Sequence, residues 1–93
     1  MRKPDAIALL TRALNAGARV AGLRLEVRDA RSRSWASATF IGERVELVLS
    51  ITGTGGAGWL AGLPDADLPM RGWYVADLEI RGAELRALLL QDA

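Results

Sequence analysis

The chain of 93 residues contains neither cysteine nor histidine. Without cysteine it forms no disulfide and offers no thiolate nucleophile or thiolate metal ligand. Without histidine it lacks the usual general base near neutral pH and the commonest metal ligand. These absences weigh against catalysis and metal binding. We therefore expect a non-enzymatic protein with no cofactor, no catalytic residue and no metal site.

Long uncharged apolar runs are also missing. A membrane span needs about eighteen or more apolar residues, whereas Asp5, Arg12 and Asn15 interrupt the N-terminal run. The same residues argue against reading the N-terminus as a secretory signal. We expect a cytoplasmic protein that does not bind membranes. The single lysine, Lys3, beside abundant Ala and Leu is typical of GC-rich bacterial genomes.

The charges are unevenly distributed along a chain whose net charge is +1. Residues 1–44 hold nine basic and four acidic groups, and residues 45–93 hold three basic and seven acidic groups. The hydrophobic fraction of 51% is that of an ordinary soluble domain. We expect one domain over residues 1–93 in which the acidic half folds against the basic half. Binding of nucleic acid is therefore the less favoured reading of the basic half.

Residues 4–16 have the pattern of an amphipathic helix. Ile7, Leu10 and Leu14 recur at helical spacing. Pro4 suits the first turn of such a helix. Gly17 is the expected end, because it can adopt the left-handed cap conformation.

From residue 23 onward the apolar period becomes two. Leu23, Leu25 and Val27 alternate with charged residues, as in a half-buried strand, whereas the polar residues 29–34 resemble a loop. Two further strands are expected at about 35–41 and 44–52, joined by Gly42-Glu43 in a type II′ turn. This turn would pair apolar residues on the face toward the helix: Phe40 with Val45, Ala38 with Leu47, and Ala36 with Leu49.

A second hairpin is expected near the C-terminus. Strands at about Trp73–Arg81 and Glu84–Gln91 flank Gly82-Ala83. The expected register has apolar pairs on one face and opposite charges on the other: Ile80 with Leu85, Leu78 with Ala87, Ala76 with Leu89, Arg81 with Glu84, and Glu79 with Arg86. The last strand also has helical propensity, but the double charge match favours the strand.

Residues 53–72, between the hairpins, show no regular period. The segment Trp59–Leu63 is compatible with a helical turn or two that ends at Gly62 and Pro64. Together the elements predict an α+β fold in the order α-β-β-β-β-β, with two glycine-turn hairpins. In this fold one N-terminal helix packs on a mainly antiparallel sheet of about five strands.

The run from Gly53 to Gly58 fits the spacing G-x-G-x-x-G of dinucleotide-binding loops. Such loops place pyrophosphate on the N-terminus of a full helix within a parallel βαβ unit. Here Pro64 follows within about six residues, and the flanking strands form hairpins, so a flexible crossover is the favoured interpretation. The alternative is a small-ligand or anion-binding loop made by Gly53, Gly55, Gly56 and Gly58, with Trp59 as a lid.

Two pairs of carboxylates lie close in sequence. Asp65 and Asp67 stand in a short loop, and calcium needs about six or more oxygen ligands, so turn formation explains them better. Asp77 and Glu79 share one face of a strand, as paired catalytic carboxylates can. Because Arg86 is the expected ion-pair partner of Glu79, neither pair predicts a metal or catalytic site.

Arginines gather in the segment from Arg24 to Arg33, beside an aromatic residue: Arg24, Arg28, Arg31, Arg33 and Trp35. Basic grooves with stacking aromatics bind single-stranded nucleic acids, so weak binding of RNA or single-stranded DNA is one alternative function. The competing interpretation is that Arg28 packs on the ring of Trp35 while nearby acidic residues dilute the positive field.

The face of the sheet away from the helix carries the most informative group. Seven apolar residues are expected there: Trp35, Ile41, Val48, Trp73, Val75, Leu88 and Leu90. So much apolar surface does not stay in water. The Trp59 segment, a second subunit, or a foreign partner or ligand must cover it. Because two-fold pairing is the commonest solution, we expect an interaction module that forms a homodimer through this face.

Overall fold

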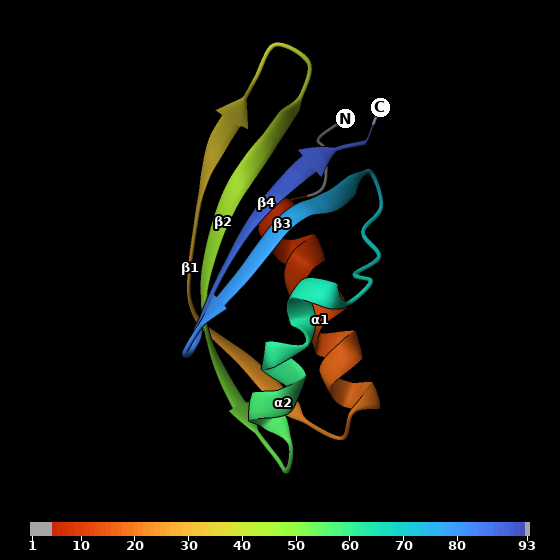
Figure 1. Ribbon diagram of the computed structural model, residues 1–93, viewed down its shortest axis with the longest axis vertical. Coiled ribbons are helices and arrows are strands. Elements are labelled where there is room, and N and C mark those ends of the chain that lie inside the picture. Colours follow the sequence, from red (N-terminus) through yellow and green to blue (C-terminus); the bar gives the residue numbers. More distant parts are fainter. Residues whose placement is uncertain (1–4, 93) are drawn as a thin grey trace.

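The computed structural model describes residues 5–92. In chain order the elements are α1 (Ala6–Val20), β1 (Arg24–Ala36), β2 (Ile41–Thr52), α2 (Gly56–Ala61), the 3₁₀ helix η1 (Leu63–Asp65), β3 (Trp73–Arg81) and β4 (Glu84–Gln91). The strands form an antiparallel sheet in the order β1-β2-β4-β3, and both α-helices lie on one side of it (Figure 1). The α+β class is confirmed, but residues 5–92 contain four strands where about five were expected.

Local hydrogen bonds define both ends of α1. The side chain of Asp5 accepts a hydrogen bond of 3.1 Å from the N–H two residues later, as N-cap residues do. At the other end Gly22 has φ +75°, and the Leu23 N–H donates to the Ala18 carbonyl at 2.8 Å. This is the Schellman arrangement, in which a left-handed glycine follows the last helical turn.

Gly17 lies inside α1, so the helix end expected at this residue is wrong. The spacing of buried residues continues past it, from Leu14 to Ala18, and burial on the same helix face extends the helix. A Cβ atom at Gly17 would stand 3.4 Å from Trp59 Cζ2. Gly17 therefore lies within the helix beside the indole of α2 and does not end α1.

One apolar core fills the space between the helices and the sheet. Its largest fully buried side chains come from α1, β2 and β4: Leu10, Leu14, Val45, Leu47, Leu85 and Leu89. Trp59 of α2 packs against this core, and Leu63 of η1 is buried in it. The segment that was expected to be irregular thus covers the helix side of the sheet. Among residues 5–92, no helix has the length and apolar character that a membrane span requires.

The first hairpin turns at a different place from the one expected. β1 continues as a strand through the polar residues 29–34, and the chain reverses between Ser37 and Phe40, where the Ser37 N–H donates to the Phe40 carbonyl at 2.9 Å. The expected turn at Gly42-Glu43 is wrong, as are the three apolar pairs that depended on it. Because β1 is an edge strand, it tolerates polar side chains, and two expected strands merge into one.

Gly42 lies within β2 because the sheet leaves no space for a side chain there. A Cβ atom at this position would overlap the carbonyl oxygen of Leu89 and would lie 2.8 Å from Leu90 Cδ2. The glycine therefore permits the close approach of β2 and β4 rather than a chain reversal.

The second hairpin agrees with the prediction in its bounds and in most of its register. Four expected pairs form: Ile80 with Leu85, Leu78 with Ala87, Glu79 with Arg86, and Arg81 with Glu84. β4 is a strand and not a helix. The expected pair of Ala76 with Leu89 is wrong, because Val75 takes that place and Asp77 pairs with Leu88. Ala76 is thus the extra residue of a β-bulge.

Candidate functional site

One side of the sheet faces away from both helices, and we name it the outer face (Figure 1). Within residues 5–92 the apolar core lies on the helix side and does not include Val48, Leu88 or Leu90 of the outer face. Trp59 packs against Gly17 on the helix side. The alternative in which the Trp59 segment covers the outer face is therefore excluded.

The register arranges the outer face in four rows, each with one residue from every strand. Directly opposed residues of antiparallel strands share a face, so the rows follow from the three strand pairings. In the order β1, β2, β4, β3 they are Trp35-Gly42-Leu90-Tyr74, Arg33-Arg44-Leu88-Asp77, Arg31-Glu46-Arg86-Glu79 and Asp29-Val48-Glu84-Arg81. We name them the aromatic, arginine, alternating and mixed rows.

Not all of the seven apolar residues that were expected on the outer face lie there in the structure. Four of them lie there: Trp35, Val48, Leu88 and Leu90. Trp73 and Val75 belong to the helix-side core, because the bulge at Ala76 shifts the phase of β3 by one residue. Ile41 has the same phase as the core residue Val45 and is 60% exposed. These three residues are therefore misplaced in the sequence-based prediction.

Tyr74 was missed by the sequence reasoning, although it lies in the aromatic row. It pairs with Leu90 and is 39% exposed. The bulge places Tyr74 on the outer face and turns its two neighbours inward. The signal in the sequence is a change of phase around Ala76, where apolar residues move from odd to even positions: Trp73 and Val75, then Leu78 and Ile80.

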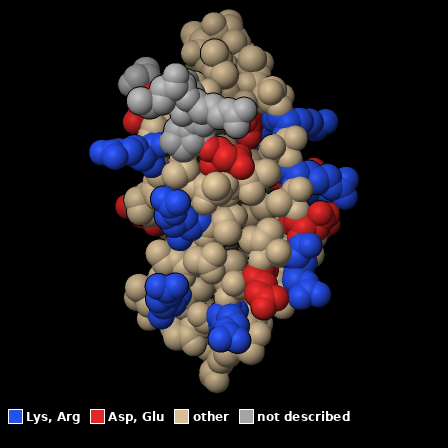
Figure 2. All heavy atoms as spheres, turned by 180° about the vertical axis from the view of Figure 1, so that it is seen from behind, with Lys and Arg blue, Asp and Glu red and all other residues tan. Residues whose placement is uncertain are grey.

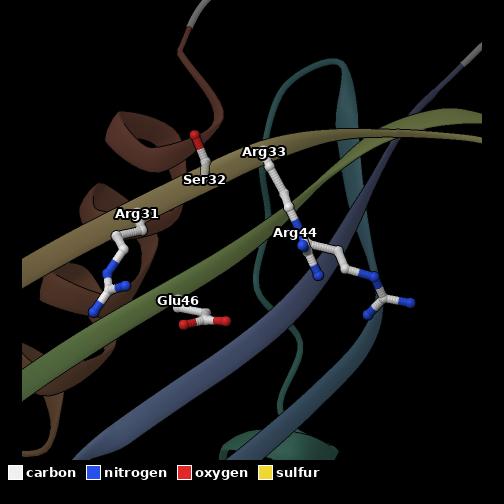
Figure 3. A pocket seen from close by; sticks show the side chains of 5 residues that line it. All are labelled: Arg31, Ser32, Arg33, Arg44 and Glu46. Carbon is white, nitrogen blue, oxygen red and sulfur yellow. The ribbon is translucent and has the colours of Figure 1, made fainter.

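Two arginines stand together in the arginine row. Arg33 and Arg44 are directly opposed on β1 and β2, and with Arg31 and Glu46 they line a hollow of about 240 Å³. Figure 3 shows the side chains of Arg33 and Arg44 leaving their strands toward the same side. Within residues 5–92 neither has an ion-pair partner. Like charges in this position destabilise a sheet, so the pair is a candidate site for a negative group.

The other arginines of the expected basic segment are placed apart from this pair. Arg28 is the bulge residue of β1, and its Nη1 lies 3.2 Å from Glu26 Oε2. Arg31 Nε lies 3.8 Å from Asp29 Oδ2. Trp35 is opposite Gly42 near the far end of the strand. The expected packing of Arg28 on Trp35 is therefore wrong.

A second hollow, of about 230 Å³, crosses the outer face from β1 to β3. Arg33 and Arg44 lie at one end of it, and Asp77 and Glu79 at the other. Asp77 also has no ion-pair partner among the described residues. The arginine row is thus positive at β1 and β2 and negative at β3, with half-buried Leu88 between.

Ion pairs on β3 and β4 run along the strands rather than across them. Arg81 pairs with Glu79, two positions away on β3, and Arg86 Nη2 lies 3.5 Å from Glu84 Oε2 on β4. The cross-strand register expected for these residues is correct, but the charged atoms that meet belong to neighbours in sequence. These side chains are about half exposed or more, so each pair contributes little to stability.

The candidate glycine loop leads into a short helix. Gly53 and Gly55 have φ +128° and +86°, and α2 is six residues long. Trp59 packs on Gly17 and does not stand as a lid over the loop. Gly53 and Gly55 therefore have conformational roles, and anion binding by Gly53, Gly55, Gly56 and Gly58 stays a prediction.

The candidate carboxylates do not form a metal centre in the described part of the chain. Asp65 ends η1 and Asp67 follows it without regular structure. Asp77 and Glu79 project from the outer face, as expected, in two adjacent rows. No group of three or more potential ligands gathers within residues 5–92.

The end of the first hairpin is a second apolar surface. Residues 34–42 carry no charged side chain, and Phe40 and Ile41 are 46% and 60% exposed. Figure 2 shows the uncharged end at the top of the molecule, above a body where basic and acidic side chains are mixed. We name this surface the hairpin tip. It shares Trp35 and Gly42 with the aromatic row.

Comparison with known proteins adds no functional information. The chain matches no protein-family model, no curated protein and no solved structure. The function must therefore be argued from the geometry of the outer face.

Proposed function

We propose that the protein is a non-enzymatic interaction module that self-associates as a homodimer through the outer face. The support is the outer face, over which residues 5–92 place no second layer: Trp35, Val48 and Leu88 are half-buried there among charged side chains, whereas Leu90 is only 6% exposed. A second copy on this face would remove apolar surface from water, at about 25 cal/mol per Å². Identical faces paired by a two-fold axis are the commonest form of association.

The interface that we propose differs from the one expected from sequence. Trp73 and Val75 already lie in the helix-side core, and Ile41 belongs to the hairpin tip. Tyr74 joins the outer-face residues in their place. Leu88 lies near the centre of this interface, because its strand is an inner one and its row an inner row.

The oligomeric state tests this proposal directly. Light scattering on a sizing column, from micromolar to millimolar concentration, is expected to give the mass of a dimer. Leu88→Asp should weaken association, because it places a desolvated carboxylate at the centre of the interface. Val20→Asp is the matched control: Val20 ends α1 and is 91% exposed. A monomer at every concentration, or equal effects of the two variants, would contradict the proposal.

The binding of a polyanion is a second candidate function, supported by the unpaired Arg33 and Arg44 in one hollow. A single-stranded oligonucleotide is the probe. Binding should fall steeply with salt, and Arg44→Gln should weaken it more than Arg71→Gln, which changes an exposed arginine in the turn before β3. No retention on an oligonucleotide column at low salt would end this candidate.

The cytoplasmic location expected from the sequence belongs to the proposal as well. It is tested by fractionating cells that express the chain, and recovery outside the cytoplasmic fraction would contradict it.

A further inference from the structure

We infer that the two copies meet face to face about a two-fold axis parallel to the strands, so that opposite charges of the outer faces oppose one another. This inference rests on the proposed self-association and specifies its geometry. The partner is a second copy of this chain, and the evidence is the order of charges within the rows of the outer face.

The axis determines which strands meet. A two-fold axis that runs between the two sheets, parallel to their strands, reverses the strand order and keeps the position along the strands. β1 then lies over β3 of the second copy, and β2 lies over β4. Each row of one copy meets its own reversed copy. Sheets packed in this way are separated by about 10 Å, with their strands roughly aligned.

The alternating row becomes fully complementary in this arrangement. Its charges read plus, minus, plus, minus from β1 to β3, and the reversed order is minus, plus, minus, plus. Arg31 therefore faces Glu79 of the partner subunit, and Glu46 faces Arg86 of the partner subunit. By symmetry each contact occurs twice.

The arginine row explains the groups that lack an ion pair within one chain. Arg33 faces Asp77 of the partner subunit, so the unpaired cation and the unpaired anion of the row meet. Arg44 faces Leu88 of the partner subunit, which the methylene stem of an arginine can cover while its charged end stays in water. The second copy therefore supplies Arg33 with an anionic partner and Arg44 with an apolar surface for its stem.

The two outer rows are compatible with the same axis. In the mixed row Asp29 faces Arg81 of the partner subunit. In the aromatic row Trp35 faces Tyr74 of the partner subunit, which brings two aromatic rings together. Leu90 and Gly42 of this row are already buried within each chain, where Leu90 Cδ2 lies over Gly42, so they add little to the contact.

A two-fold axis across the strands gives the opposite result. An axis through the alternating row would put each strand over its own copy, so that Arg31 faces Arg31 of the partner subunit and Glu46 faces Glu46 of the partner subunit. Every contact in this row would then join like charges, which opposes association. The charge order of the row therefore distinguishes the two axes.

Pairing at the sheet edges is also disfavoured. β1 is one edge and alternates charged residues along most of its length. β3 is the other edge and contains the bulge at Ala76. Charges and bulges are the features that keep edge strands from pairing with other chains. The outer face is thus the better surface for a second copy.

Exchange of the charges at Arg33 and Asp77 tests the axis. These residues lie on the two edge strands, so within one chain they are separated by three strand spacings, about 14 Å. R33D and D77R should each raise the dimer dissociation constant about tenfold or more, because each creates two like-charged contacts. The double variant R33D/D77R should return it close to the original value. Rescue over this distance requires contact between subunits.

The two single variants also test the axis when they are mixed. The R33D chain has acidic groups at both positions, and the D77R chain has basic groups at both. Neither should pair well with itself, but together they form two contacts of opposite charge, so native mass spectrometry should show mainly the mixed dimer. R71D and D65R, in the segment between the hairpins, are the control pair and should leave the dissociation constant unchanged.

The outcomes separate the two levels of the proposal. A chain that is monomeric throughout overturns both the axis and the self-association. A stable dimer whose dissociation constant is unchanged by R33D and D77R, or that is not rescued by the double variant, overturns the axis alone. Rescue by the double variant together with preferential mixing supports both.

Discussion

Arg33 of β1 stands directly opposite Arg44 of β2, and neither has an ion-pair partner within residues 5–92. Opposed residues of antiparallel strands have Cα atoms about 4.5–5.5 Å apart, so two cations are held side by side on the outer face. Within a single chain, the contact between these two cations does not stabilise the sheet. A negative group of another molecule that approaches the outer face would offset the repulsion between the two arginines.

We expect Arg44→Gln to stabilise the fold slightly. Removing one of two opposed cations should raise the free energy of unfolding by about 0.2–1 kcal/mol at low salt, and the gain should shrink as salt screens the charges. Urea denaturation at low protein concentration, in low and high salt, measures it. Arg71→Gln is the control. A loss of stability in R44Q would show that the Arg44 cation has a favourable contact within the chain.

Gly42→Ala should destabilise the protein strongly. Because the new Cβ would overlap the Leu89 carbonyl oxygen, β2 and β4 must separate, and the expected loss is about 1–3 kcal/mol. Gly58→Ala is the matched control, because a Cβ there meets nothing within 4 Å and the residue lies in α2. It should be neutral or stabilising by up to about 1 kcal/mol. Equal effects in thermal denaturation would contradict the strand position of Gly42.

Trp73→Ala and Trp35→Ala should affect different properties. Trp73 is 6% exposed in the helix-side core, so its loss should lower the free energy of unfolding by about 3–5 kcal/mol. Trp35 lies half-buried on the outer face, and its loss should weaken association more than folding. Denaturation and light scattering on both variants measure the two effects. A stable W73A chain that no longer associates would place Trp73 on the outer face.

Two glycines near the end of α1 should respond oppositely to alanine. Gly17 is helical, and a Cβ there stands at ordinary contact distance from Trp59, so Gly17→Ala should stabilise by about 0.5–1 kcal/mol. Gly22 has φ +75°, a conformation that alanine adopts poorly, and Gly22→Ala should destabilise by about 1 kcal/mol. Thermal denaturation of the two variants measures both changes in stability. The reverse order would place the end of α1 at Gly17.

The two hairpins show what local sequence can and cannot reveal. Gly82 lies in a turn, with φ +60°, and flanking charges of opposite sign confirm its register. Gly42 offers the same local signal, but it is required for space next to Leu89 and Leu90 of β4, which lie 47 and 48 residues away in sequence. A sequence pattern does not distinguish a glycine needed for its backbone angle from one needed for close approach.

The candidate site was predictable only in part for a related reason. Arg31 and Arg33 were singled out from the sequence, and Asp77 was expected to share a strand face with Glu79. The pairing of β2 with β4 places Arg44 and Asp77 in one row. No pattern among neighbouring residues in the sequence indicates this pairing. Bulges at Arg28 and Ala76 then changed which neighbours face outward, because one extra residue inverts every later side chain.

The strand order also bears on how the chain assembles. The contact of β2 with β4 is the one place where the sheet residues of the two hairpins meet within the described chain. Hairpins close locally within microseconds, whereas distant pairing is slow. We therefore expect docking of two preformed halves to limit the folding rate. A backbone cut between Gly53 and Gly72 should leave fragments that recombine on mixing, with the fluorescence of Trp73 reporting their union.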